Sequence, residues 1–114
     1  MTAPRDYRLY LEDILKAVES IEKYVEGLDA RSFESDRKTQ DAVVHNLEII
    51  GEAVKRVPDE FRTKHPEIEW KPAAAMRDFL IHDYPEVDVD AVWHTVMDDL
   101  PALKAGVTKC LAEK

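Results

Sequence analysis

The chain has little of what several classes of protein require. Among its 114 residues there are one cysteine and three glycines. A single thiol cannot form an intrachain disulfide, and a cysteine-based zinc site would lack ligands. No apolar run approaches the roughly 20 residues of a membrane helix, and the N-terminus lacks the apolar stretch of a signal peptide. We therefore expect a cytoplasmic protein that does not contact a membrane.

The amino-acid composition favours helices. The composition is 45% apolar and 35% charged, which suits one compact helical domain over residues 1–114. The net charge of −8 opposes non-specific binding to nucleic acid, because such binding requires Lys and Arg to neutralise phosphates. A local basic site stays open, since positive charges gather shortly before Arg77 in the sequence, at Lys55, Arg56, Arg62, Lys64 and Lys71.

Two long segments carry apolar residues every three or four positions, as along one face of an amphipathic helix. The first segment predicts a helix over residues 5–28, followed by a polar loop over residues 29–35. The second predicts a helix that Ser35 or Asp36 can cap and that ends at Pro58.

Prolines shape the middle of the chain. Residues 58–66 lie between two prolines and predict a short turn of helix. A third helix should begin at Trp70 and end close to His82 or Asp83. The reason for this end is Tyr84, which precedes a proline and is therefore pushed away from α-helical geometry.

The last segment predicts a fourth helix that Asp88 or Asp90 can cap. Pro101 lies inside it and removes a backbone hydrogen bond, so we expect a kink or a break near residues 98–100. Together these elements predict an all-α protein, an antiparallel bundle of four to five helices.

The polar residues that could do chemistry gather at the end of the third helix. Asp78 and His82 are four positions apart and share one helix face, so the carboxylate can orient the imidazole. Arg77 points about 140° away from His82 on an ideal helix. One chain therefore assembles the pair imperfectly, whereas a two-fold dimer could bring two copies of each residue into one cleft. From spacing alone, an ordinary hydrogen-bonded helix end explains the same residues.

Such a dimeric cleft would suit RNA cleavage without a metal ion. One imidazole would accept the proton of a ribose 2′-hydroxyl, a second would protonate the leaving oxygen, and Arg77 would stabilise charge on the phosphate. We expect no metal site, because His45, His65 and His94 are scattered and no pair has the four-residue spacing of a helical metal site.

Three stretches resemble one known family. Residues 77–84, Arg-Asp-Phe-Leu-Ile-His-Asp-Tyr, resemble the Arg-x4-His-x-Tyr motif of the HepT-like toxins, a group of HEPN proteins. Residues 47–53, Leu-Glu-Ile-Ile-Gly-Glu-Ala, are similar to the family's second-helix signature, and residues 99–103 are similar to its last helix. The three stretches appear in the expected order and span most of the chain.

The resemblance implies a homodimeric HEPN bundle that acts as the toxin of a type VII toxin–antitoxin system. It implies an endoribonuclease with His82 as acid and base and Arg77 at the phosphate, and with no cofactor of its own. Its partner would be a minimal nucleotidyltransferase antitoxin that transfers AMP from ATP onto Tyr84. Two alternatives stay open: a non-catalytic helical module that this antitoxin binds and modifies, and a plain dimeric bundle.

Two residues of the second helix could support the site. Asn46 falls within the apolar arc, and a buried amide must find hydrogen-bond partners, so it either braces a neighbouring helix or lines a cleft. Glu52 lies in the family-like stretch and could pair with Arg77 of either protomer, although it could also be an ordinary solvated carboxylate.

Overall fold

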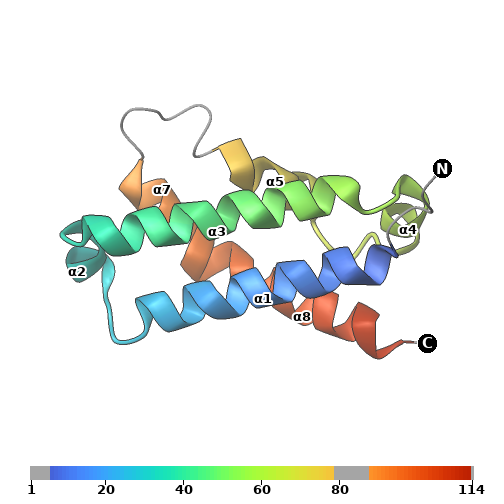
Figure 1. The fold of residues 1–114 in the computed structure, drawn as a ribbon, viewed down its shortest axis with the longest axis horizontal. Coiled ribbons are helices and arrows are strands. Elements are labelled where there is room, and N and C mark those ends of the chain that lie inside the picture. Colours follow the sequence, from blue (N-terminus) through green and yellow to red (C-terminus); the bar gives the residue numbers. More distant parts are fainter. Residues whose placement is uncertain (1–5, 79–87, 114) are drawn as a thin grey trace.

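Two long helices lie side by side and run in opposite directions. The computed structural model describes residues 6–78 and 88–113, and within these ranges it contains helices and no strand. Helix α1 (Tyr7–Val25) packs against α3 (Arg37–Arg56), and α8 (Leu100–Ala112) packs against α1 (Figure 1). The all-α fold class predicted from the sequence is confirmed.

Helix α1 buries one apolar stripe against the rest of the bundle. The side chains of Leu11, Ile14, Val18 and Ile21 are fully buried, as their spacing predicts. At its N-terminus, Asp6 accepts a hydrogen bond from the backbone N–H of Arg8. The helix is shorter than the predicted range, and Gly27 follows it with a φ of 79°, a left-handed conformation that glycine adopts without steric cost.

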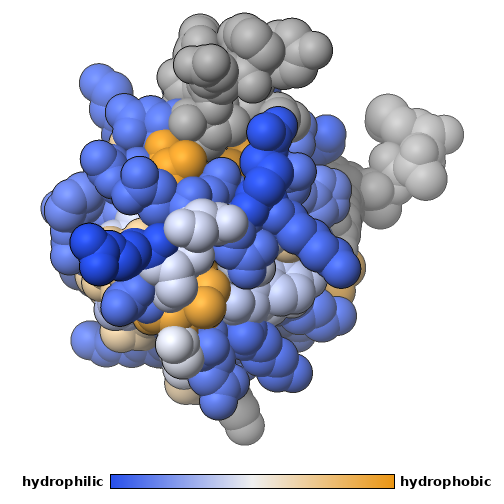
Figure 2. Space-filling view, turned by 90° about the vertical axis from the view of Figure 1, so that its left-hand side faces the viewer, coloured by the Kyte–Doolittle hydropathy of each residue, from blue (hydrophilic) through white to orange (hydrophobic). Residues whose placement is uncertain are grey.

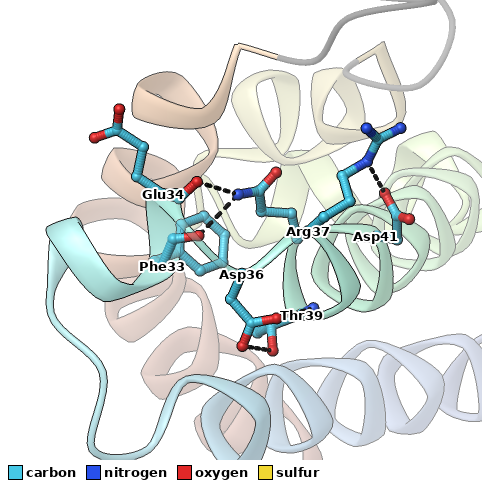
Figure 3. A network of polar contacts seen from close by, with 7 residues as sticks. Phe33, Glu34, Asp36, Arg37, Thr39 and Asp41 are labelled. Carbon is cyan, nitrogen blue, oxygen red and sulfur yellow. Dashed lines mark hydrogen bonds and ion pairs between the residues drawn. The ribbon is translucent and has the colours of Figure 1, made fainter.

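The start of α3 is fixed by polar contacts (Figure 3). Asp36 caps the helix by accepting a hydrogen bond from the Thr39 backbone N–H at 3.0 Å, so the predicted cap is confirmed at Asp36. The buried Gln40 amide donates to the carbonyl oxygens of Phe33 and Glu34 at 2.8 and 2.9 Å. These bonds hold the preceding segment against the first turn of α3.

The predicted polar loop over residues 29–35 is wrong in part. A short helix, α2 (Ala30–Glu34), occupies most of it. Asp29 and Ser32 form a capping box in which each side chain bonds the other's backbone N–H. Phe33 is fully buried and stacks against Trp93 with ring centroids 5.0 Å apart, which supplies the tertiary contact that a five-residue helix needs.

The middle of the chain returns along α3 in short pieces. Helix α4 (Asp59–Lys64) lies where the two prolines predict a short helix, and α5 (Trp70–Ala74) begins at Trp70 as predicted. The 3₁₀ turn η1 (Ala75–Arg77) follows, and both α5 and η1 pack against α3. The predicted end of this helix near His82 lies outside the described residues.

The last helical segment is interrupted before Pro101. Helix α7 (Val89–His94) is capped by Asp88, one of the two predicted caps. It continues into the π-helical turn η2 (Thr95–Asp99), and α8 begins at Leu100. A wider turn accommodates a residue that has no N–H to donate and that crowds the preceding carbonyl groups. The predicted break is therefore wrong, because the helix continues through a π turn at residues 95–99, and the predicted kink stays a prediction.

Polar side chains dominate the end of the molecule at which α2 lies, with only small apolar areas between them (Figure 2). The apolar residues are instead gathered between α1, α3 and α8, where Leu47, Ile50 and Val107 are fully buried. Among the described helices, none combines the length and the apolar character needed to cross a bilayer.

Candidate functional site

The backbone of η1 approaches α3 at Gly51. A Cβ atom added to Gly51 would lie 2.7 Å from the backbone nitrogen of Arg77 and 2.8 Å from the carbonyl oxygen of Ala74. Only a residue without a side chain permits this approach. Gly51 therefore places the backbone of the motif arginine directly on the helix that carries the family-like stretch 47–53.

The next residue of α3 holds the arginine side chain. Arg77 Nη1 donates a hydrogen bond to Glu52 Oε1 at 2.5 Å, and Arg77 Nε lies 3.9 Å from Asp78 Oδ1. The Arg77 hydrogen bond lowers the pKa of the Glu52 carboxyl, and that same bond raises the pKa of Arg77. Both residues are consequently charged at neutral pH, and the predicted pairing is confirmed within one chain.

The Arg77 guanidinium is held without being enclosed. Its side chain is 30% exposed and that of Glu52 is 44% exposed. A guanidinium has five N–H donors arranged in a fork, so the bond to Glu52 and the ion pair with Asp78 leave donors for a further anion. Such a group can stabilise charge on a phosphate that arrives from solvent.

Replacing Gly51 with alanine should destabilise the protein. The added methyl group meets backbone atoms, which cannot rotate away, and overpacking of this kind costs about 1–3 kcal/mol. The better helix propensity of alanine offsets roughly 1 kcal/mol of this cost. We expect a lower denaturant midpoint in equilibrium unfolding of the variant.

Gly106→Ala is the matched control. Its added Cβ would meet the Ile68 side chain at 2.7 Å, and a side chain can move where a backbone cannot. Gly106→Ala should therefore cost less than Gly51→Ala. The close approach at Gly51 would have no structural role if the Gly51 variant were as stable as the wild type.

A groove of about 360 Å³ lies between α1 and α3, and Glu52 is part of its lining. Its lining combines carboxylates, one imidazole and one arginine with partly exposed apolar side chains. Its lining residues are Tyr10, Asp13, His45, Glu48, Ile49, Glu52, Ala53 and Arg56. Spacing along α3 placed His45, Glu48 and Glu52 on one polar arc, but only the packing of α1 beside them makes a groove.

Asn46 is buried, as predicted, but its hydrogen bond is local. Its Nδ2 donates to the Ala42 carbonyl oxygen at 2.9 Å, one turn earlier in α3. This bond satisfies the amide donor within α3 itself, whereas the sequence predicted a contact with a neighbouring helix or a cleft. Asp78 follows η1 beside Arg77, whereas His82 and Tyr84 lie outside the described residues, so their relation to Arg77 stays a prediction.

Sequence reasoning missed one cluster. His65, Glu67 and Cys110 bring potential ligand atoms within 4.8 Å of one another. Cys110 is buried, as expected of a small apolar residue near the end of the last helix. Burial raises the pKa of the Cys110 thiol above its ordinary value. No spacing rule links a cysteine to a histidine 45 positions away, so the sequence holds no signal for this contact.

Comparisons with known proteins point to one family. A family model described as "Ribonuclease HepT-like" matches residues 14–110. A protein of Thermococcus cleftensis named "Probable ribonuclease HepT" is 49% identical over 105 residues, which cover 92% of this chain and 96% of that relative. A "Putative RNase" of Caldanaerobacter subterraneus is 42% identical over 107 residues, 94% of this chain and 96% of the relative.

A third relative is a longer protein. The "Gamma-glutamylcyclotransferase and putative RNase" of Methanocaldococcus jannaschii is 42% identical over 109 residues. The match covers 96% of this chain and 49% of that relative, so the chain corresponds to about half of it. The search of solved structures gave no significant match.

Proposed function

Because this chain belongs to the HepT-like ribonuclease family, we propose that it is an endoribonuclease in which Arg77 and His82 act on the scissile phosphate of RNA. One observation carries the proposal. The backbone of Arg77 packs against α3 at Gly51, and the Arg77 side chain bonds to Glu52 while part of its guanidinium is exposed to solvent. A preorganised cation of this kind stabilises charge that develops on a phosphate.

The reaction needs one base and one acid. One imidazole accepts the proton of the ribose 2′-hydroxyl while its oxygen attacks phosphorus. The bond from phosphorus to the 5′-oxygen then breaks, and a second imidazole donates its proton to that leaving oxygen. Two imidazoles and a guanidinium supply every group that this transfer requires, so we propose that cleavage needs no metal ion.

A homodimer is part of this proposal. The motif supplies one histidine per chain, whereas the reaction uses an acid and a base. A two-fold axis beside the motif would place two copies of His82 and two of Arg77 at one cleft. This requirement, together with the family, supports a dimer as the active form.

We further propose that the protein is the toxin of a toxin–antitoxin pair. A nucleotidyltransferase antitoxin would transfer AMP from ATP onto the Tyr84 hydroxyl and release pyrophosphate. The added phosphate would carry negative charge next to Arg77 and His82 in the motif, and it would compete with RNA for the same cation. The family and the Tyr84 position in the motif support this control.

Cleavage of RNA by the purified protein tests the proposed activity. Wild-type protein incubated with a labelled RNA in excess chelator should yield fragments, because no step uses a metal ion. The fragments should end in a cyclic 2′,3′-phosphate, the product of attack by the 2′-hydroxyl. Intact RNA at every concentration and salt condition would rule out the nuclease and favour the non-catalytic partner module.

Co-expression with a nucleotidyltransferase encoded beside the gene tests the control. Intact-mass spectrometry should show the chain heavier by one or more AMP groups, and the modified protein should no longer cleave RNA. Tyr84→Phe removes only the accepting hydroxyl, so that variant should keep its mass and its activity. AMP on another residue, or full activity after modification of Tyr84, would contradict the proposal.

A further inference from the structure

Helix α4 and the C-terminal end of α8 lie at the same end of the molecule (Figure 1). Three side chains with metal-binding atoms meet in this part of the chain. His65 and Glu67 come from the segment between α4 and α5, and Cys110 comes from the last turn of α8. His65 Nδ1 lies 3.2 Å from Glu67 Oε2 and 3.4 Å from Cys110 Sγ. All three potential ligand atoms lie within 4.8 Å of one another.

The two contacts of His65 converge on one nitrogen atom. A hydrogen-bonded relay from a thiol through an imidazole to a carboxylate uses the two ring nitrogens, one for each neighbour. Here the carboxylate and the thiol both face Nδ1. This arrangement does not suit a relay, whereas one cation can contact Nδ1, the carboxylate and the sulfur together.

The two distances from His65 Nδ1 agree with a tetrahedral cation. Zinc bonds to nitrogen and oxygen at about 2.0–2.2 Å and to thiolate sulfur at about 2.3 Å. Tetrahedral angles then separate nitrogen from oxygen by roughly 3.3 Å and nitrogen from sulfur by roughly 3.6 Å. The observed separations from Nδ1, 3.2 and 3.4 Å, are close to both values.

The surrounding residues hold the ligands in place. The His65 ring stacks on Phe61 with centroids 4.4 Å apart, and Trp70 Nε1 donates to the His65 carbonyl oxygen at 2.9 Å. Ile68, in the same segment, packs against Gly106, one helical turn before Cys110. Ile68 thus packs the segment on α8, and Phe61 and Trp70 hold His65, by contacts that do not involve the three ligand atoms.

We propose that His65, Glu67 and Cys110 bind a zinc-class divalent cation. The imidazole, the carboxylate and the thiolate supply three positions, and water completes the fourth on the side of Glu67, whose side chain is 49% exposed. The Cys110 thiol releases its proton to solvent as the metal–sulfur bond forms. This revises the expectation of no metal site, which rested on spacing within single helices.

The cation would join the α4–α5 segment to α8. It uses neither Arg77 nor His82, so its role is structural and independent of the proposed RNA cleavage. A ligand that binds only the folded chain stabilises it in proportion to the logarithm of its concentration over Kd. With zinc at a hundredfold excess over Kd, the melting temperature should rise by on the order of 10 °C.

Titration of the metal-free full chain with Co²⁺ or Zn²⁺ tests the site. Co²⁺ should bind once per chain and produce the near-ultraviolet absorption of a cobalt–thiolate bond, which Zn²⁺ should then remove. Zn²⁺ alone should raise the melting temperature. Mg²⁺ should not, because it prefers oxygen ligands in octahedral geometry.

Variants separate this site from adventitious binding. Cys110→Ser should abolish the thiolate absorption, and Glu67→Gln, at a half-exposed position, should weaken zinc binding by more than about tenfold. His94→Gln is the matched control, because His94 Nδ1 also lies 3.2 Å from a carboxylate, that of Asp98, in an exposed pair. His94→Gln should bind as the wild type does.

Two results would overturn the proposal. One is the absence of thiolate absorption with Co²⁺ in the wild type. The other is an equal melting shift with Zn²⁺ in the wild type and in Glu67→Gln. If Cys110→Ser does not fold, zinc binding by Glu67→Gln and by His94→Gln can still be compared, because both residues lie at the surface. That comparison then tests the site.

Discussion

Replacing His82 with alanine should lower the rate of RNA cleavage by about 10²- to 10⁴-fold, the usual contribution of general acid and base catalysis. In the proposed dimer this single substitution removes both the acid and the base, so the upper part of the range is expected. The measurement is the initial rate on a labelled RNA with saturating protein, compared with the wild type.

A second histidine provides the control. His94 is exposed in α7 and lies outside the motif, so His94→Ala should leave the rate unchanged. Unfolding of the His82 variant should match that of the wild type, which would exclude loss of the fold as the cause. A His82 variant that cleaves as fast as the wild type would remove this residue from the mechanism.

Replacing Arg77 with alanine should lower the cleavage rate by about 10²- to 10³-fold, because a preorganised donor to the phosphate is lost. Arg77→Lys keeps the charge but not the planar fork, so it should restore only part of the rate. Glu52→Gln keeps Arg77 but removes the negative charge that holds its side chain. This variant should lower the cleavage rate less than Arg77→Ala does.

Arg56→Ala controls for net charge. Arg56 is an exposed arginine at the end of α3 that lines the groove beside Glu52, so its replacement removes the same charge as Arg77→Ala from a neighbouring element. We expect that variant to weaken RNA binding slightly and to keep the maximal rate. Equal losses for Arg56→Ala and Arg77→Ala would mean that Arg77 acts only through general electrostatic attraction.

The helices could be predicted because their apolar spacing is regular and their ends carry strong signals. Asp36 caps α3, Asp88 caps α7, and Pro101 lies just after the π turn of the last segment. Helix α2 could not be predicted in the same way. Its five residues depend on a capping box and on the burial of Phe33 against Trp93, and the latter contact links segments far apart in the chain.

The candidate site could be predicted only in part. The motif identified Arg77, and the family-like stretch suggested Glu52, but spacing could not decide between pairing within a chain and pairing across a dimer. Gly51 decides it, because its missing side chain lets η1 approach α3 so closely that the neighbouring Glu52 reaches Arg77. The sequence could not predict the hydrogen-bond partner of Asn46 either, because a buried amide can bond to a carbonyl oxygen of its own helix.

The cluster at Cys110 shows what spacing rules omit. They apply to residues on one helix or in one short motif, whereas His65 and Cys110 are 45 positions apart. Their contact arises because the segment between α4 and α5 packs on α8. Ile68 contacts Gly106 of α8, and the Trp70 side chain donates a hydrogen bond to the His65 carbonyl oxygen. A lone cysteine can therefore have partner ligands that no pattern in the sequence indicates.

Mixed dimers test the central claim, that two copies of His82 form one active site. Wild-type chains and His82→Ala chains are unfolded together in equal amounts, refolded, and assayed at constant total protein. If both imidazoles are needed, only wild-type homodimers cleave, and about a quarter of the wild-type rate should remain under random pairing. A rate of about half would mean that each chain acts alone, and it would contradict the dimeric site.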